Sequence, residues 1–374
     1  MKELKVAIVH DWLVTNAGAE KVLKVIVELY PNADIFSLVD FLNNEQRDKI
    51  ILGKSVQTSF IQKLPLAKTH FRNYLPLFPK AIESLDLTDY DLIISSSWAV
   101  AKGVKKSKNQ RHICYSHTPI RYAWDLYEEY TSQLKQPKKF LVQKTLKYIR
   151  RWDISTLDRV DFFIANSTFV AERIKNTYKK DAKVIHPPVD VNNFILFTQK
   201  EDFYLCASRL VPYKKTKLIV EAFNTMPNKK LVVIGKGEEY KEIKTIAKSN
   251  IEVLGYQSDD ILREYMQRAK GFIYMALEDF GIIPVEAMAC GTPVIGYGVG
   301  GLKDTVIDKE TGVFFKEQSM DSLIKAIDRF ERLKFDYKNI SNHAYSFSIE
   351  RFKEEFIKFE KSTQNLSSTP QFNL

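Results

Sequence analysis

Short apolar runs alternate with amphipathic segments along most of the chain. In the first half, four apolar runs indicate buried parallel strands, and a segment with helical spacing of its apolar residues follows each. The predicted strands are residues 5–10, 91–97, 112–115 and 161–166, and the first predicted helix is residues 19–30. This alternation with short connections is typical of an α/β protein built on parallel sheets.

A proline pair interrupts the alternation. Residues 186–190 read His-Pro-Pro-Val-Asp, and two prolines are excluded from a helix interior or a central strand, so we expect a linker here. Beyond it the alternation restarts. The predicted strands are residues 203–207, 230–234, 251–254, 271–275 and 292–296, and the predicted helices are residues 215–226, 238–248, 259–268, 283–289, 320–333 and 349–360. The pattern predicts two tandem α/β domains, with the ligand site in a cleft at the carboxyl ends of both sheets.

Composition supports a folded protein in a reducing compartment. The 374 residues are 45% hydrophobic and include 24 Phe, 18 Tyr and 4 Trp, which excludes intrinsic disorder. Apolar runs fall far short of the roughly 20 residues that span a bilayer, and the first residues lack the pattern of a signal peptide. Cys114, Cys206 and Cys290 are far apart and have apolar or small neighbours, so we expect buried free thiols. The expected location is the cytoplasm, or its boundary with the inner face of the membrane.

The positive charge is unevenly distributed. Residues 1–190 carry 30 Lys and Arg against 21 Asp and Glu, a net +9, whereas residues 191–374 carry 26 against 25, a net +1. Much of the excess lies in residues 101–111 and 135–151, and the latter holds seven cations, no acid and interleaved apolar residues. Such a helix suits an anionic membrane surface, or it is the solvated face of a core-packed helix. No recognition motif supports nucleic-acid binding.

Two turns carry groups suited to a diphosphate. The first strand–helix turn lacks the Gly-x-Gly-x-x-Gly fingerprint, but Gly18 and Ala19 would let helix-terminal amides approach an anion. In the second half, Arg209 and Lys214 flank Pro212, which we expect to keep the loop out of a helix so that both cations converge on one point. Each feature alone also fits an ordinary solvated loop.

Carboxylates and imidazoles follow other predicted strands. Glu278 comes after a strand, and Glu286 lies eight residues later on a helix face of small apolar residues, where sugar hydroxyls would be suitable partners. His117 lies just past a strand, in a setting that favours a site residue over a structural one. His10 and Asp11 also end a strand and could face an acceptor.

The sequence offers no evident metal site. Asp89 and Asp91 match the Asp-x-Asp pattern, but they precede a strand, which places them at the opposite end of the sheet from the ligand site. Clusters of His, Cys and Asp with metal-ligand spacing are also missing from the sequence. We therefore expect a metal-independent protein.

Four motifs in order resemble the retaining family 4 glycosyltransferases of the GT-B fold: the AGAE turn, ASRLVPYKK, VVIGKGEE and EDFGIIPVEAMACGTPVI. The first half, with HDWLVTNAGAEKVL and CYSHTPIRYAWDLYEEY, is similar to bacterial mannosyltransferases of surface-polysaccharide assembly. The resemblance covers nearly the whole chain. It implies two Rossmann-like domains facing across a cleft, residues 1–190 on the acceptor side and residues 191–346 binding the nucleotide sugar. It also implies that a C-terminal helix, about residues 347–374, returns to the first domain.

The resemblance also assigns roles. Arg209 and Lys214 would grip the donor diphosphate, Glu278 the transferred sugar and Glu286 the ribose, while His117 would face the reacting sugar. The remaining donor-binding positions that it implies are Gly18, Gly235, Gly237, Phe280, Gly281 and Ile282. The departure is Ala17-Gly18 where many members have Gly-Gly, which weakens the expected amide contact.

The predicted function is transfer of a sugar, with retention, from a nucleotide sugar to a glycan or lipid-linked acceptor. The resemblance favours GDP-mannose as the donor and implies that no metal or other cofactor takes part. Two other classes stay open: a GT-B sugar-nucleotide epimerase, which would need further acid–base carboxylates, and a non-enzymatic adaptor binding membrane or nucleic acid through residues 135–151.

Overall fold

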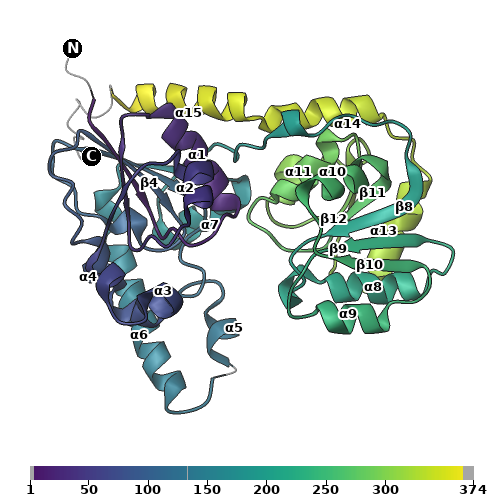
Figure 1. The fold of residues 1–374 in the computed structure, drawn as a ribbon, viewed down its shortest axis with the longest axis horizontal. Helices are drawn as coiled ribbons and strands as arrows, with labels where there is room; N and C mark the ends of the chain where they lie inside the picture. Colours follow the sequence, from purple (N-terminus) through teal and green to yellow (C-terminus); the bar gives the residue numbers. More distant parts are fainter. Residues whose placement is uncertain (1–3, 133, 365–374) are drawn as a thin grey trace. The chain divides into compact units, whose positions relative to one another are not determined.

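The computed structural model describes residues 4–132 and 134–364, which form two compact α/β units (Figure 1). The described residues up to His186, together with those from Phe352 onward, make the first unit, and Pro187–Arg351 make the second. Residues 365–374 of the predicted C-terminal segment lie outside the described residues.

The first unit is built on a seven-stranded parallel sheet in the order β3-β2-β1-β4-β5-β6-β7. All four strands predicted for this half are present. Three short strands, β2, β3 and β7, were not predicted, because three or four residues carry too little periodicity. The strands are β1 (Val6–His10), β2 (Asp34–Ser37), β3 (Val56–Thr58), β4 (Leu92–Ser97), β5 (Arg111–Ser116), β6 (Phe162–Ala165) and β7 (Ala182–Val184).

Helices cover this sheet, and α5 and α6 extend away from it (Figure 1). The helices are α1 (Gly18–Leu29), α2 (Asn44–Ile51), α3 (Ala67–His70), α4 (Phe78–Ile82), α5 (Tyr127–Ser132), α6 (Lys138–Ser155), α7 (Thr168–Tyr178) and α15 (Ile349–Gln364). Helix α1 was predicted over residues 19–30 and buries Val22, Val25 and Ile26 on the sheet side. The central strands β1 and β4 are buried on both faces, as expected for a parallel sheet.

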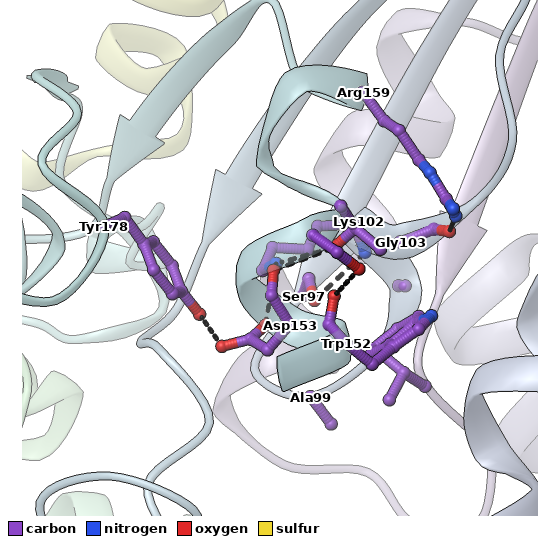
Figure 2. A network of polar contacts seen from close by, with 12 residues as sticks. Ser97, Ala99, Lys102, Gly103, Trp152, Asp153, Arg159 and Tyr178 are labelled. Carbon is purple, nitrogen blue, oxygen red and sulfur yellow. Dashed lines mark hydrogen bonds and ion pairs between the residues drawn. The ribbon is translucent and has the colours of Figure 1, made fainter. Parts of the chain in front are cut away.

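A buried ion pair anchors α6 (Figure 2). Lys102 Nζ lies 2.7 Å from Asp153 Oδ1 of α6, and the other carboxylate oxygen accepts hydrogen bonds from Tyr178 and Trp124 at 2.9 and 2.8 Å. A Cβ on Gly103 would lie 2.3 Å from the Trp152 ring, so glycine lets α6 approach closely. Because breaking a buried pair leaves one charge uncompensated, this contact fixes α6 in place.

The second unit has a six-stranded parallel sheet in the order β10-β9-β8-β11-β12-β13. The strands are β8 (Glu201–Ala207), β9 (Lys230–Ile234), β10 (Ile251–Gly255), β11 (Ala269–Tyr274), β12 (Val294–Tyr297) and β13 (Gly312–Phe315). The helices are α8 (Thr216–Asn224), α9 (Tyr240–Ile246), α10 (Asp259–Arg268), α11 (Ile282–Ala289), α12 (Leu302–Thr305), α13 (Met320–Glu331) and α14 (Tyr337–Ala344). Strand β13 and helices α12 and α14 were not predicted.

Side chains of β8 alternate between two cores. Phe203 and Leu205 pack with α10, α11 and α14, whereas Tyr204 and Cys206 pack with α8, α9 and α13. Figure 1 shows the same two helical layers on opposite faces of the sheet. The three cysteines are buried and free, as predicted.

The C-terminal helix α15 returns to the first unit, as expected. Glu360 forms an ion pair with Arg111 of β5, Lys353 lies 2.7 Å from Glu28 of α1, and Phe352 packs edge-on against Tyr115. The two sheets and this helix confirm the predicted α/β class.

Candidate active site

Lys214 and Glu278 meet at the carboxyl edge of the second sheet. Lys214 follows β8, Glu278 follows β11, and these two strands are neighbours. Their side chains form an ion pair and are 15% and 25% exposed, so the charges are partly shielded from water yet reachable. The expectation that Pro212 keeps this loop out of a helix is wrong. Pro212 begins a one-turn 3-10 helix, Pro212–Lys214, because proline is tolerated at the first helical position.

Aromatic rings border the ion pair. Lys214 Nζ lies 5.3 Å from the centroid of the Tyr213 ring and 5.8 Å from that of Tyr274. Burial, followed by the nearby Glu278 carboxylate, raises the pKa of Tyr274 well above its usual value, so its hydroxyl stays protonated. The arrangement offers a cation for phosphate oxygens and a carboxylate for hydroxyl groups.

The loop that carries Arg209 is held by two glycines of the next turn. The amide nitrogens of Ser208 and Leu210 donate to carbonyl oxygens of Ile234 and Lys236 at 3.1 and 2.9 Å. A Cβ on Gly235 would lie 1.9 Å from Ser208 O, and one on Gly237 would lie 2.1 Å from Leu210 O. These contacts explain both glycines by close backbone packing, and their direct contact with a ligand stays a prediction.

Arg209 itself is exposed, and within residues 4–132 and 134–364 its guanidinium has no ion pair. The structure thus leaves one cation of the predicted couple open to solvent and pairs the other with a carboxylate.

The loop from Glu278 leads directly into α11. Gly281 is the N-cap of this helix with φ of +88°, and a Cβ there would lie 3.2 Å from the Tyr274 hydroxyl oxygen. Phe280 is buried beside it, and Ile282 begins the helix. Glu286 is half-buried in the second turn of α11. The predicted strand–turn–helix setting of the two carboxylates is therefore present.

A second glycine-rich loop supports the first. Gly301 donates its N–H to Glu278 O at 2.9 Å, and a Cβ on Gly301 would lie 2.3 Å from Asp279 O. Gly300 has φ of +84°, and its Cβ would lie 2.5 Å from Glu278 O. These glycines fix the position of the backbone that carries Glu278.

In the first unit, His117 stands at the carboxyl end of β5, where the sequence placed it. Its ring is half-buried, and burial lowers its pKa to about 3, so the imidazole is neutral at physiological pH. Its Nε2 lies 2.8 Å from Ser96 Oγ, which also lies 3.1 Å from His10 Nδ1. Gly18 is exposed as the first residue of α1.

Sequence reasoning missed Ser96 and Glu20. Glu20 lies 3.8 Å from His10 and is 3% exposed. Three consecutive serines at the end of a buried strand are the signal that could have revealed Ser96.

Asp11 does not face an acceptor, contrary to the prediction. It is fully buried, and its two oxygens accept hydrogen bonds of 2.6–2.8 Å from the amides of residues 98–101. His10 is fully buried too. Both side chains are therefore out of reach of a bound ligand.

Metal-ligand clusters and membrane-spanning helices were both unexpected from the sequence. Among residues 4–132 and 134–364, we find no group of three or more His, Cys, Asp or Glu arranged to hold a metal ion. Asp89 and Asp91 precede β4, and Asp91 accepts the Lys5 amide at 2.9 Å. No helix in the described part of the chain has the length and apolarity to cross a membrane.

Two family models match the chain, one for each half. A model described as glycosyl transferases group 1 matches residues 191–347, and one described as glycosyltransferase family 4 matches residues 39–193. The chain belongs to the family 4 glycosyltransferases. The matched segments contain His117 and all the candidate site residues of the second unit, whereas His10, Asp11 and Gly18 lie outside them.

Individual members of this glycosyltransferase family show the same relationship. An uncharacterised glycosyltransferase of Methanocaldococcus jannaschii is 30% identical over 188 residues, 48% of this chain and 52% of that one. The O-antigen chain mannosyltransferase RfbU of Salmonella typhimurium is 21% identical over 326 residues, 82% of this chain and 88% of that one. The match thus spans about half the length of the first curated relatives.

A solved structure shares the fold. The crystal structure of Anabaena HepE in complex with UDP superposes with a TM-score of 0.68 at 16% identity, covering 96% of this chain and all of that one. At this identity the likeness establishes the GT-B fold alone.

Proposed function

We propose that this family 4 glycosyltransferase moves a sugar, with retention, from a nucleotide-diphosphate sugar to a glycan or lipid-linked acceptor. The observation that carries the proposal is the Lys214–Glu278 pair at the carboxyl edge of the second sheet. A departing diphosphate needs preorganised positive charge when no metal supplies it, and sugar hydroxyls need an acceptor such as a carboxylate. Both groups stand there, in the segments that follow two neighbouring strands.

The roles we assign are those that the family resemblance implies. Lys214 and exposed Arg209 stabilise the departing diphosphate, and Glu278 binds the transferred sugar. Glu286 binds the ribose, and the backbone of Phe280–Ile282, at the start of α11, lies along the sugar and phosphate. In the first unit, His117 binds a substrate hydroxyl, and the amide of Gly18 at the start of α1 binds an anionic oxygen.

Mannose is the sugar that we favour. Similarity to RfbU, named as a mannosyltransferase, supports it, whereas the UDP complex of HepE supports a uridine donor instead. We therefore place GDP-mannose first and UDP-hexoses second, in surface-polysaccharide synthesis.

A thermal-shift series with GDP-, UDP- and ADP-sugars tests the proposal. A ligand at 100 times its Kd raises the stability by about 2.7 kcal/mol, so the true donor raises the melting temperature and the others do not. Excess EDTA should leave both the shift and the turnover unchanged. Absence of a shift with every nucleotide sugar would contradict donor binding, and release of free UDP without an acceptor product would favour an epimerase.

A second proposal concerns a membrane partner. We propose that the exposed face of α6 contacts an anionic bilayer. Leu146 and Ile149, two of the apolar residues interleaved with the cations of this helix, are buried in the core, and Arg150 binds the carbonyl of Ala123. Phe140 and Leu141 are 55% and 67% exposed. The remaining docking face is Lys138, Phe140, Leu141, Lys144, Lys147, Tyr148 and Arg151.

Co-sedimentation with vesicles tests this docking face. Replacing four of its cations by glutamine (Lys138, Lys144, Lys147 and Arg151) should abolish binding to anionic vesicles, since each contributes about 1 kcal/mol. The control changes the same charge elsewhere, at the exposed lysines Lys108, Lys183, Lys241 and Lys325. Equal sedimentation of the two variants, or binding that ignores anionic lipid, would leave α6 as a solvated helix.

A further inference from the structure

Four polar side chains lie in a row behind the half-buried ring of His117, and hydrogen bonds join the first three. Starting from His117 Nε2, the chain runs 2.8 Å to Ser96 Oγ and 3.1 Å on to His10 Nδ1. His10 Nε2 in turn lies 3.8 Å from Glu20 Oε1. The register of β1 on β4 sets His10 opposite Ser96, so the sheet itself builds the contact.

A hydrogen bond at one oxygen fixes the Glu20 carboxylate, and its other oxygen interacts with His10 through charge alone. Its Oε2 accepts the Ala17 amide at 2.9 Å, at the start of α1, which leaves Oε1 facing His10. The carboxylate and His10 are 3% and 0% exposed, so water does not screen their interaction. An ionised carboxylate has no proton to donate, and it therefore favours a proton on His10 Nε2.

The hydroxyl of Ser96 couples the position of the His10 proton to that of the His117 proton. A serine has one hydroxyl proton and can donate it to only one of two imidazoles. With the His10 proton on Nε2, His10 Nδ1 is an acceptor and takes the Ser96 proton. Ser96 Oγ must then accept a proton from His117 Nε2. A neutral imidazole has one N–H, so His117 Nδ1 is left with a lone pair.

The rings are held in place by packing. Trp98 lies edge-on to His10 at 4.9 Å and to His117 at 5.6 Å. The Trp98 amide donates to Asp11 at 2.6 Å, which fixes the loop that carries the tryptophan. The chain is thus preorganised before any ligand binds.

We infer that Glu20 is a positioning residue that, through His10 and Ser96, holds His117 as a hydrogen-bond acceptor at Nδ1 for a hydroxyl of the substrate. The inference rests on the proposed function, because it gives His117 a substrate to bind. An acceptor at this point selects a hydroxyl over a deoxy position, which offers no proton. Among the described residues Nδ1 has no protein partner, so it is open to such a hydroxyl.

Nuclear magnetic resonance of the free protein tests the relay. In protein carrying ¹⁵N-histidine, long-range ¹⁵N–¹H correlations identify each tautomer, and the His10→Asn and His117→Asn variants assign the two rings. We expect His117 protonated at Nε2 in the wild type. In Glu20→Gln, the amide oxygen keeps the Ala17 bond and the NH₂ group faces His10, so the relay should reverse and move the His117 proton to Nδ1. Ser96→Ala should release the preference.

Glu28→Gln is the matched control, because this carboxylate lies on the same helix outside the chain of contacts. It should leave the His117 tautomer and turnover unchanged, whereas Glu20→Gln should lower kcat roughly tenfold, the effect of one hydrogen bond. An Nδ1–H tautomer in the wild type, an unchanged tautomer in both Glu20→Gln and Ser96→Ala, or a reversed tautomer with normal turnover would overturn the inference. The tautomers are measured without substrate, so absence of any sugar transfer would contradict only the proposed function.

Discussion

Lys214 is the residue on which the proposed chemistry depends most. Its replacement by alanine removes a cation from the diphosphate and leaves the Glu278 carboxylate without its partner. We expect kcat to fall by about 10²–10³, the usual loss for one contact that strengthens in the transition state. Initial rates measure the loss, and Lys217→Ala, which removes an exposed lysine of the next helix, serves as the control. Activity within threefold of wild type in Lys214→Ala would remove Lys214 from the mechanism.

A second prediction at the residue scale concerns the stability of the fold at low pH. His112 is fully buried between Ser95 Oγ and Arg159 O, each at 2.8 Å, and burial lowers its pKa to about 4. In the unfolded chain the ring takes up its proton near pH 6.5, so stability falls as the pH drops from about 6.5 toward 4, by roughly 1.4 kcal/mol per unit. His117, whose pKa burial lowers to about 3, adds a similar slope over this range. Urea midpoints at pH 7, 6 and 5 should show the combined slope, and His112→Gln should make it shallower by about half. Identical slopes would mean that other groups dominate.

Elements differ in how far the sequence could predict them. Long apolar runs gave the central strands, because a parallel strand buried on both faces is continuously hydrophobic. The short strand β13 escaped prediction, since four residues starting at Gly312 carry no periodicity. Its glycine is required by packing, because a Cβ would lie 2.1 Å from Val294 O. The same limit applies to the candidate site: residue types and spacing pointed to Lys214 and Glu278, but their ion pair depends on β8 lying next to β11, which is a property of the fold.

At the element scale, we expect the turn after β9 to matter for turnover as much as Arg209, whose loop it supports. Gly235→Ala would place a Cβ 1.9 Å from a backbone oxygen at φ of +148°, so the loop carrying Arg209 has to shift. We expect a loss of about 1–3 kcal/mol in stability together with a fall in turnover. Lys236→Ala, an exposed change in the same turn, should affect neither by comparison. Normal melting and normal kinetics in Gly235→Ala would show that the turn yields without cost.

At the scale of the whole molecule, the net charge of a sequence segment does not predict how much unpaired charge it presents on the surface. Several cations in the basic stretch of residues 101–111 are paired: Lys102 with Asp153, Lys106 with Asp161 and Arg111 with Glu360. A linear count cannot see partners 50 to 250 residues away, as the separations of 51, 55 and 249 residues make plain. The stretch of residues 101–111 therefore presents less unpaired charge than its count of cations suggests.

The pair of Arg111 with Glu360 joins distant ends of the sequence. The two side chains are 9% and 6% exposed, so Glu360→Ala leaves a nearly buried guanidinium without its counter-charge. We expect a loss of about 3–5 kcal/mol from the unfolding transition of the first unit. The double variant Arg111→Met, Glu360→Met should recover most of it. Thermal unfolding followed by circular dichroism measures both, and equal melting of wild type and Glu360→Ala would contradict the expected anchoring.

The return of α15 also sets an order of events during synthesis. The first unit takes its last described helix from beyond Arg351, so the second unit, Pro187–Arg351, must leave the ribosome before the first unit is complete. At about 5–20 residues per second, this interval lasts roughly 10–30 s. Throughout it, the surface around Tyr115 and Arg111 that receives Phe352 and Glu360 is uncovered. The unit that is translated first can thus complete its fold only after the other unit has been translated.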